Sequence, residues 1–227
     1  MPILSAFGAL KSFGAQGKAA GYSANFNNAS YCGYSAGSID PELNNFSVEL
    51  FINQTATPPA ASSDVIFDTR FESGIGGMRI AITEALNITA TFGNPSGGNI
   101  TMTSSSTITT GAWYYIAVSR VSGTTRMFIG SSQVASSSSI TWSLSFPNNR
   151  FGAGIDSLTT NYLNAKLAAF RLNIGSGFST ATVPTGPLSP TAETKILTFQ
   201  TSSLINEIGG AAPTTNTGVT VSPDDPF

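Results

Sequence analysis

The sequence predicts an all-β protein that folds as a β-sandwich or jelly roll. In most apolar runs the hydrophobic side chains alternate with polar ones, which is the pattern of a half-buried strand. Clusters of Gly, Pro, Ser and Asn separate these runs, and the 227 residues include 23 Gly and 12 Pro. Because a long helical pattern is missing, we expect one large domain made of many short strands.

The first clear strand is predicted at residues 46–52. Every second side chain there is apolar, as a strand with one buried face requires. Ser47 and Glu49 fall on the opposite face, where Phe51 is the exception to the polar pattern.

Residues 65–72 form the second predicted strand. The alternation places Phe67 and Phe71 toward the interior. It places Asp68 and Arg70 toward solvent. Since these two lie on one face, we expect an exposed ion pair or an edge contact, which contributes little stability.

The same alternation predicts the remaining strands. The clearest of them begins at Trp113, which we expect to anchor the core, and it continues as an antiparallel meander through two turns. Residues 163–174 contain Ala and Leu and fit neither a helix nor a strand cleanly, but their context favours a strand. The predicted strands are 78–83, 86–92, 100–104, 113–120, 126–129, 133–134, 140–146, 150–152, 163–174, 195–199 and a short one around 219–221.

Composition excludes several classes of function. Charged residues make up 10% of the chain and the net charge is −2, so we expect neither nucleic acid nor an anionic membrane as a partner. The chain has no His and one Cys, which excludes His-based triads, His-ligated metals and internal disulfides. That residue, Cys32, is expected to be a buried filler. Apolar runs stay well below the roughly 20 residues that span a bilayer, and no cofactor is expected.

Five motifs occur in an order that is typical of one family. They are residues 46–52, 66–70, 111–120, 127–129 and 167–172. Together they resemble the concanavalin A-like, laminin G-like jelly-roll domain. The ending, from residue 194 onward, is similar to the last strands of such domains in bacteriophage virion proteins. The resemblance implies a laminin G-like domain at residues 25–227, preceded by an N-terminal arm at residues 1–24.

The resemblance also implies a function. It indicates a non-enzymatic bacteriophage virion structural protein, either a capsid decoration or a component of the tail fibre or baseplate. We expect a homo-oligomer that contacts other virion proteins. The alternative is a carbohydrate-binding module that attaches the particle to host surface glycans. Its candidate ligand-binding residues are Trp142, in a Ser/Thr-rich strand beside a turn, and the polar-aromatic group Asn161, Tyr162 and Asn164.

A glycoside hydrolase is the third alternative, because the fold also houses these enzymes. Hydrolysis needs two carboxyl groups about 5 to 5.5 Å or about 6.5 to 9.5 Å apart. Glu49 is alone on its strand, and Asp64, Asp68 and Glu72 are spaced by four residues, or roughly 13 Å. We therefore expect no catalytic residues. Asp64, Asp68 and Asp156 are available as oxygen ligands for a metal, and the sequence leaves open whether they converge.

The first 20 residues differ from the rest of the chain. Their apolar side chains recur at spacings of three and four residues, which suits one or two helical turns or an extended arm. We predict that this arm docks onto another subunit or virion protein. The alternative is that it closes one end of the sandwich. The predicted docking residues are Ile3, Leu4, Phe7, Leu10 and Phe13.

Overall fold

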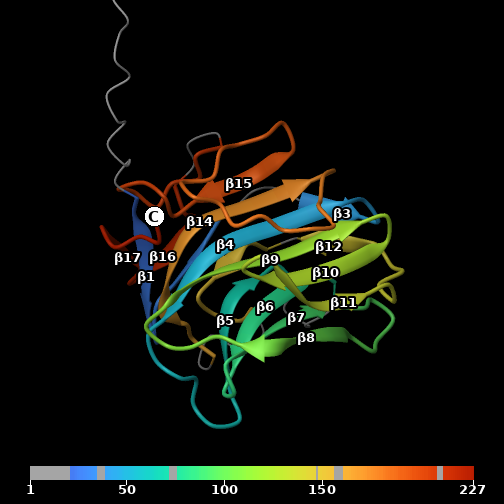
Figure 1. The fold of residues 1–227 in the computed structure, drawn as a ribbon, viewed down its shortest axis with the longest axis horizontal. Helices are drawn as coiled ribbons and strands as arrows, with labels where there is room; N and C mark the ends of the chain where they lie inside the picture. Colours follow the sequence, from blue (N-terminus) through green and yellow to red (C-terminus); the bar gives the residue numbers. More distant parts are fainter. Residues whose placement is uncertain (1–20, 35–38, 72–75, 147, 156–160, 209–211) are drawn as a thin grey trace, which may run out of the picture.

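The computed structural model describes residues 21–34, 39–71, 76–146, 148–155, 161–208 and 212–227. Within these ranges the regular secondary structure consists of strands, without helices. Two large antiparallel sheets form a sandwich, accompanied by a small two-stranded sheet (Figure 1). The predicted all-β jelly-roll sandwich is confirmed. Because the described residues contain no helix, they also contain no membrane-spanning helix.

Eight strands form the first sheet: β1 (Ser23–Asn27), β4 (Phe46–Gln54), β9 (Trp113–Val121), β10 (Thr124–Ile129), β11 (Ser132–Ser137), β14 (Asn164–Ile174), β15 (Thr194–Thr198) and β17 (Thr220–Ser222). Their order is β11-β10-β9-β4-β14-β1-β17. The long strand β14 pairs with β4 on one side. On its other side it pairs with β1 along its first half and with β15 along its second half.

Seven strands form the second sheet: β2 (Tyr31–Gly33), β5 (Ser63–Asp68), β6 (Met78–Thr83), β7 (Asn87–Phe92), β8 (Ile100–Thr107), β13 (Arg150–Phe151) and β16 (Thr215–Thr217). Their order is β16-β2-β13-β5-β6-β7-β8. The small sheet pairs β3 (Ile39–Glu42) with β12 (Leu144–Phe146). Of the strand predicted at 140–146, only the last three residues are a strand.

Strand β14 contains a bulge. Ala169 has a φ of 49°, and the pairing with β4 shifts register between Ala168 and Arg171. Ala168 and Ala169 therefore both face outward, whereas Leu167 and Phe170 face the interior. The predicted strand at 163–174 is confirmed, and the bulge explains its irregular spacing of apolar residues.

An aromatic cluster occupies the interior between the two sheets. Its centre is Phe151 of β13, which is fully buried. Four rings surround it at centroid distances of 4.6, 4.7, 4.9 and 5.8 Å, from Phe170, Phe67, Phe199 and Tyr34 respectively. Since Phe67 belongs to the second sheet and Phe170 to the first, the cluster joins the two layers.

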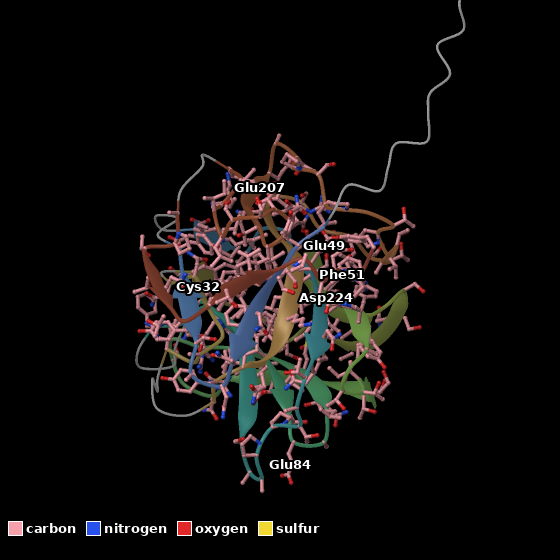
Figure 2. All side chains as sticks on the ribbon, turned by 90° about the vertical axis from the view of Figure 1, so that its left-hand side faces the viewer. Cys32, Glu49, Phe51, Glu84, Glu207 and Asp224 are labelled. Carbon is pink, nitrogen blue, oxygen red and sulfur yellow. The ribbon has the colours of Figure 1, made fainter. Side chains whose placement is uncertain are left out.

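A second apolar cluster covers the outer face of the first sheet. Phe51 and Tyr115 project there from β4 and β9 and belong to the same cluster as Leu188 from the segment after β14. Figure 2 shows Phe51 close to Glu49 on this side of the molecule. Phe51 lies on the strand face that otherwise carries polar side chains. Because this face is covered, its apolar side chain is not exposed. Trp113, which was expected to anchor the core, is partly buried and packs against this outer cluster rather than between the two sheets.

Three orientations predicted for residues 65–72 are wrong. Strand β5 ends at Asp68, so the alternation does not continue, and Phe71 is 44% exposed. Asp68 and Arg70 are both buried, with Arg70 Nε donating to Asp68 Oδ1 at 2.9 Å and Nη2 to Oδ2 at 2.7 Å. The Ile155 backbone N–H donates to the same carboxylate at 3.2 Å. A segment following β13 thus covers the face of β5 that was expected to be exposed.

The amino-terminal region is described from Gly21 onward. Strand β1 pairs with β14 and β17, and the expected boundary between residues 24 and 25 lies inside it. Gly21 lies so close to Asp225 that a Cβ at this position would be 2.7 Å from the Asp225 Cγ. The predicted docking residues Ile3, Leu4, Phe7, Leu10 and Phe13 lie outside the described residues.

Candidate functional site

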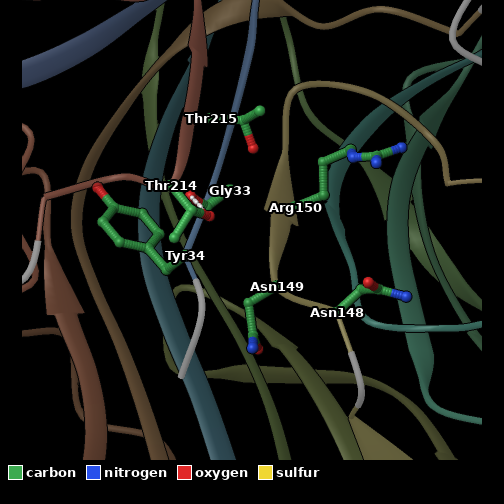
Figure 3. Close-up of a pocket in the computed structure, with 7 residues that line it drawn as sticks. All are labelled: Gly33, Tyr34, Asn148, Asn149, Arg150, Thr214 and Thr215. Atoms are coloured by element: carbon green, nitrogen blue, oxygen red, sulfur yellow. Dashed lines mark hydrogen bonds between the residues drawn. The ribbon is translucent and has the colours of Figure 1, made fainter. Parts of the chain in front are cut away.

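A pocket of about 170 Å³ opens at the edge of the second sheet, where β2, β13 and β16 lie side by side (Figure 3). We call it the edge pocket. Its described lining residues are Gly33, Tyr34, Asn148, Asn149, Arg150, Thr214 and Thr215. They come from three distant parts of the chain, which the sheet brings together.

Strand pairing explains how these residues meet. Gly33 pairs with Arg150 on one side and with Thr215 on the other. A Cβ at Gly33 would lie 3.1 Å from the Thr215 Oγ1, so the missing side chain keeps this part of the pocket open. The backbone N–H and the hydroxyl of Thr214 both donate to the Gly33 carbonyl, at 2.8 and 3.0 Å. These bonds fix the C-terminal segment against β2.

Asn149 lines the edge pocket and carries a buried polar atom. The residue is 4% exposed, and its Oδ1 is buried without a hydrogen-bond partner within the described chain. Its backbone carbonyl is satisfied by the Tyr34 N–H at 3.0 Å. A buried acceptor left unpaired costs about 1–3 kcal/mol.

Tyr34 is held as a rigid wall of the same pocket. Its hydroxyl donates to the Leu204 carbonyl at 2.6 Å and lies 2.9 Å from the Thr198 Oγ1. Burial raises the pKa of this phenol well above its usual range, so the hydroxyl keeps its proton and its role as a donor.

Arg150 supplies the positive charge of the edge pocket. Its guanidinium lies over the Tyr31 ring at 5.5 Å, and Nη1 donates to the Gly154 carbonyl at 3.2 Å. Asn148 points the same way from the chain (Figure 3), and its Nδ2 donates to the Arg70 carbonyl at 2.8 Å. Among the described lining residues there is one cation and no carboxylate. This set of amides, hydroxyls and a guanidinium can bind polar groups but offers no acid–base pair for hydrolysis.

The structure separates the four ligand-binding residues predicted from the sequence. Trp142 is partly buried against the sandwich core, and its Nε1 donates to the Gly93 carbonyl at 2.8 Å, just after β7. Asn161 has a φ of 67°, and its carbonyl accepts from the Val65 N–H at 3.1 Å, near the start of β5. A site shared by Trp142 and Asn161 would have to bridge these two locations.

Asn164 and Tyr162 lie in the same stretch as Asn161. The Asn164 N–H donates to Asp64 Oδ2 at 3.1 Å, and its carbonyl accepts from the Thr55 N–H at 2.8 Å. Tyr162 is partly exposed. None of the four predicted residues is among the described residues of the edge pocket, and their binding role stays a prediction.

The carboxylates considered as metal ligands have protein partners. Asp64 accepts from Gln54 Nε2 at 2.6 Å as well as from Asn164, and burial raises its pKa. Asp68 is engaged by Arg70, and Asp156 lies outside the described residues. Within the described ranges, no group of three or more Cys, Asp or Glu side chains is close enough to hold a metal ion.

Sequence reasoning missed the edge pocket. The run Asn148-Asn149-Arg150 follows a proline and precedes a buried strand, which marks a polar turn and nothing more specific. Its meeting with Gly33 and Thr215 depends on pairings between strands that are far apart in the chain. Only the sheet order reveals that these residues surround one space.

Solved structures of low sequence identity share this fold. A Bacteroides ovatus protein named "putative carbohydrate binding protein" matches with a TM-score of 0.60 at 15% identity, covering 89% of this chain and 59% of its own. Domains LG4-5 of the mouse laminin alpha1 chain match with a TM-score of 0.54 at 12% identity, covering 75% and 47%. A SAP-like pentraxin from Limulus polyphemus matches with a TM-score of 0.50 at 10% identity, covering 67% and 75%.

These likenesses establish the fold alone, since the identities are low. The chain spans 59% of the length of the Bacteroides protein, which is therefore considerably larger. None of the curated proteins compared with the chain matches it.

The sequence itself matches one family profile over residues 26–173, which is more than half of the chain. The matched stretch runs from β1 to β14 and includes strands of both large sheets. The profile describes the Concanavalin A-like lectin/glucanases superfamily. The chain therefore belongs to the concanavalin A-like lectin/glucanase superfamily, as its five motifs predicted.

Proposed function

We propose that the domain is a non-catalytic carbohydrate-binding module and that the edge pocket binds a sugar. The observation that carries the proposal is a pocket whose described lining residues carry amides, hydroxyls and a guanidinium. Sugar hydroxyls donate and accept hydrogen bonds, so they match a site lined by these polar groups. The absence of a carboxylate among the described lining residues supports binding without hydrolysis.

The comparisons add support of a general kind. The superfamily includes lectins, and a fold relative carries a name that refers to carbohydrate binding. Carbohydrate binding is a property of those proteins. We extend it to this chain because of the chemistry of the edge pocket.

A glycan array probed with the full-length protein, followed by calorimetry on the best glycan, tests the proposal. Asn149→Leu keeps a similar volume and removes the amide, and we expect it to weaken binding about fivefold, since a hydrogen bond contributes about 1 kcal/mol. Arg150→Gln should weaken binding further. The matched control is Arg126→Gln on β10 of the first sheet, which should bind like the wild type. The proposal is contradicted if no glycan on the array binds. It is also contradicted if Asn149→Leu and Arg150→Gln bind as tightly as the control Arg126→Gln.

We further propose that this module is part of a bacteriophage virion, as a capsid decoration or a tail-fibre or baseplate component, and that it self-associates there through its N-terminal arm. The support is the similarity of the final strands to those of virion proteins and the spacing of apolar residues in the first 20 positions. Low charge suits a protein whose task is packing and contact.

Light scattering on the full chain and on residues 21–227 tests the role of the arm. Since β1 begins at Ser23, the truncation leaves every described strand intact. We expect the full chain to be an oligomer and the truncated chain a monomer. If the full chain is already monomeric, or if truncation leaves an oligomer, self-association through the arm is refuted.

A further inference from the structure

A second pocket lies on the outer face of the first sheet and shares no described residue with the edge pocket. Its volume is about 240 Å³, and its described lining residues are Glu49, Tyr115, Phe178, Thr180 and Thr182. We call it the face pocket. From this geometry we infer that the face pocket is a second binding site, which takes a single neutral sugar ring.

The floor of the face pocket is a buried carboxylate in a fixed network. Glu49 is 4% exposed, and its Oε1 accepts from the Tyr115 hydroxyl at 2.7 Å. Its Oε2 accepts from Arg171 Nε at 3.0 Å and from Arg171 Nη2 at 2.6 Å. Arg171 is held in turn by the Ser189 carbonyl at 2.7 Å. The floor is therefore rigid, and the negative charge of Glu49 is compensated by Arg171.

This network still has acceptor capacity. An ionised carboxylate accepts about four hydrogen bonds, and three are used here. The Tyr115 hydroxyl directs its proton at the carboxylate, so its oxygen can still accept a hydrogen bond. Burial and the neighbouring Glu49 raise the pKa of this phenol, so it keeps that proton. The floor can thus receive two hydroxyl groups of a ligand.

The wall and rim of the face pocket come from the segment after β14. Phe178 is partly buried, and its ring lies 5.8 Å from the Phe128 ring. Its backbone N–H donates to the Ser119 Oγ at 2.7 Å, which ties the segment to β9. Thr180 and Thr182 are exposed at the rim. An aromatic wall beside hydroxyl groups suits the mixed apolar and polar surface of a sugar ring.

Charge and size narrow the class of ligand. A cation would need an uncompensated negative charge, but Arg171 already neutralises Glu49. An anion would meet the Glu49 carboxylate at the floor. Pockets for drug-sized ligands measure about 300–1,000 Å³, so a space of about 240 Å³ holds one ring rather than a chain of sugars. A neutral pyranose meets all of these requirements.

Two independent sites would make the domain bivalent. One copy could then hold two branches of a glycan, or two glycans, and gain avidity when the distance between them fits. Because the two pockets share no described residue, failure of the edge pocket to bind leaves the face pocket intact, and the reverse also holds.

Saturation-transfer NMR with neutral probes tests this inference. The probes are methyl glycosides of D-glucose, D-galactose, D-mannose and N-acetyl-D-glucosamine, each added to the full-length protein. Thr180→Tyr places a large side chain in the opening without removing a buried contact, and Thr185→Tyr is its control on the same exposed segment outside the pocket. Because the edge pocket is also proposed to bind a sugar, both substitutions are made in the Arg150→Gln background. We expect transfer to at least one glycoside in Arg150→Gln and in Arg150→Gln/Thr185→Tyr, and its loss in Arg150→Gln/Thr180→Tyr.

The edge-pocket variant Arg150→Gln separates the two sites. Transfer that survives Arg150→Gln and disappears when Thr180→Tyr is added assigns binding to the face pocket. The inference is overturned if Arg150→Gln shows no transfer to any probe, or if transfer persists in Arg150→Gln/Thr180→Tyr.

Discussion

Replacing Phe151 with alanine is expected to lower the free energy of unfolding by about 3–5 kcal/mol. The side chain is fully buried, and its removal leaves a cavity bounded by aromatic rings from both sheets. The surrounding rings cannot collapse into this space without moving strands, so the lost contacts are not regained. Urea denaturation followed by far-UV circular dichroism measures the loss.

Phe71→Ala is the matched control for this prediction. It removes the same side chain from a position that is 44% exposed, and we expect a change within about 0.5 kcal/mol. A similar cost for Phe71→Ala and Phe151→Ala would show that the aromatic cluster is not the stabilising centre of the sandwich.

Asp68→Ala is expected to destabilise the fold to a similar extent, by about 3–5 kcal/mol. The substitution leaves the guanidinium of Arg70 buried without its carboxylate and leaves the Ile155 N–H without its acceptor. The cost arises mainly because these buried groups lose the carboxylate that accepts their hydrogen bonds. Thermal and urea denaturation at neutral pH measure it.

An exposed ion pair in the same protein serves as the comparison. Lys166 and Asp224 are bonded but partly exposed, so we expect Asp224→Ala to cost about 0–1 kcal/mol. If Asp68→Ala lowers the free energy of unfolding no more than Asp224→Ala does, the buried ion pair stabilises the fold no more than the exposed one.

Much of the fold could be predicted from local alternation. Strands such as β4, β6 and β9 each carry a regular apolar face, because one side of each faces the interior of the sandwich. Strand β14 was harder to identify, since its bulge places Ala168 and Ala169 on one face and breaks the period. The short strands β2, β3 and β16 were missed, because three or four residues carry too little pattern to be seen.

The positions of polar side chains could not be predicted in the same way. Asp68 and Arg70 follow the rule for an exposed face, yet a segment after β13 covers them. Glu49 likewise has a solvent-facing register, and residues of the segment after β14 bury it. Alternation tells which side of a sheet a residue occupies, whereas burial depends on what lies over that side.

The pairing of the first strands with the last ones sets the order of events during synthesis. Ala24 of β1 pairs with Leu167 of β14 and with Val221 of β17, and β2 likewise pairs with β13 and β16. At about 5–20 residues per second, roughly 7–30 s separate the synthesis of Ala24 from that of Leu167. Until then both edges of β1 are unpaired on the ribosome, a state in which chaperones or aggregation compete with folding. Neither large sheet is complete until the final strands leave the exit tunnel.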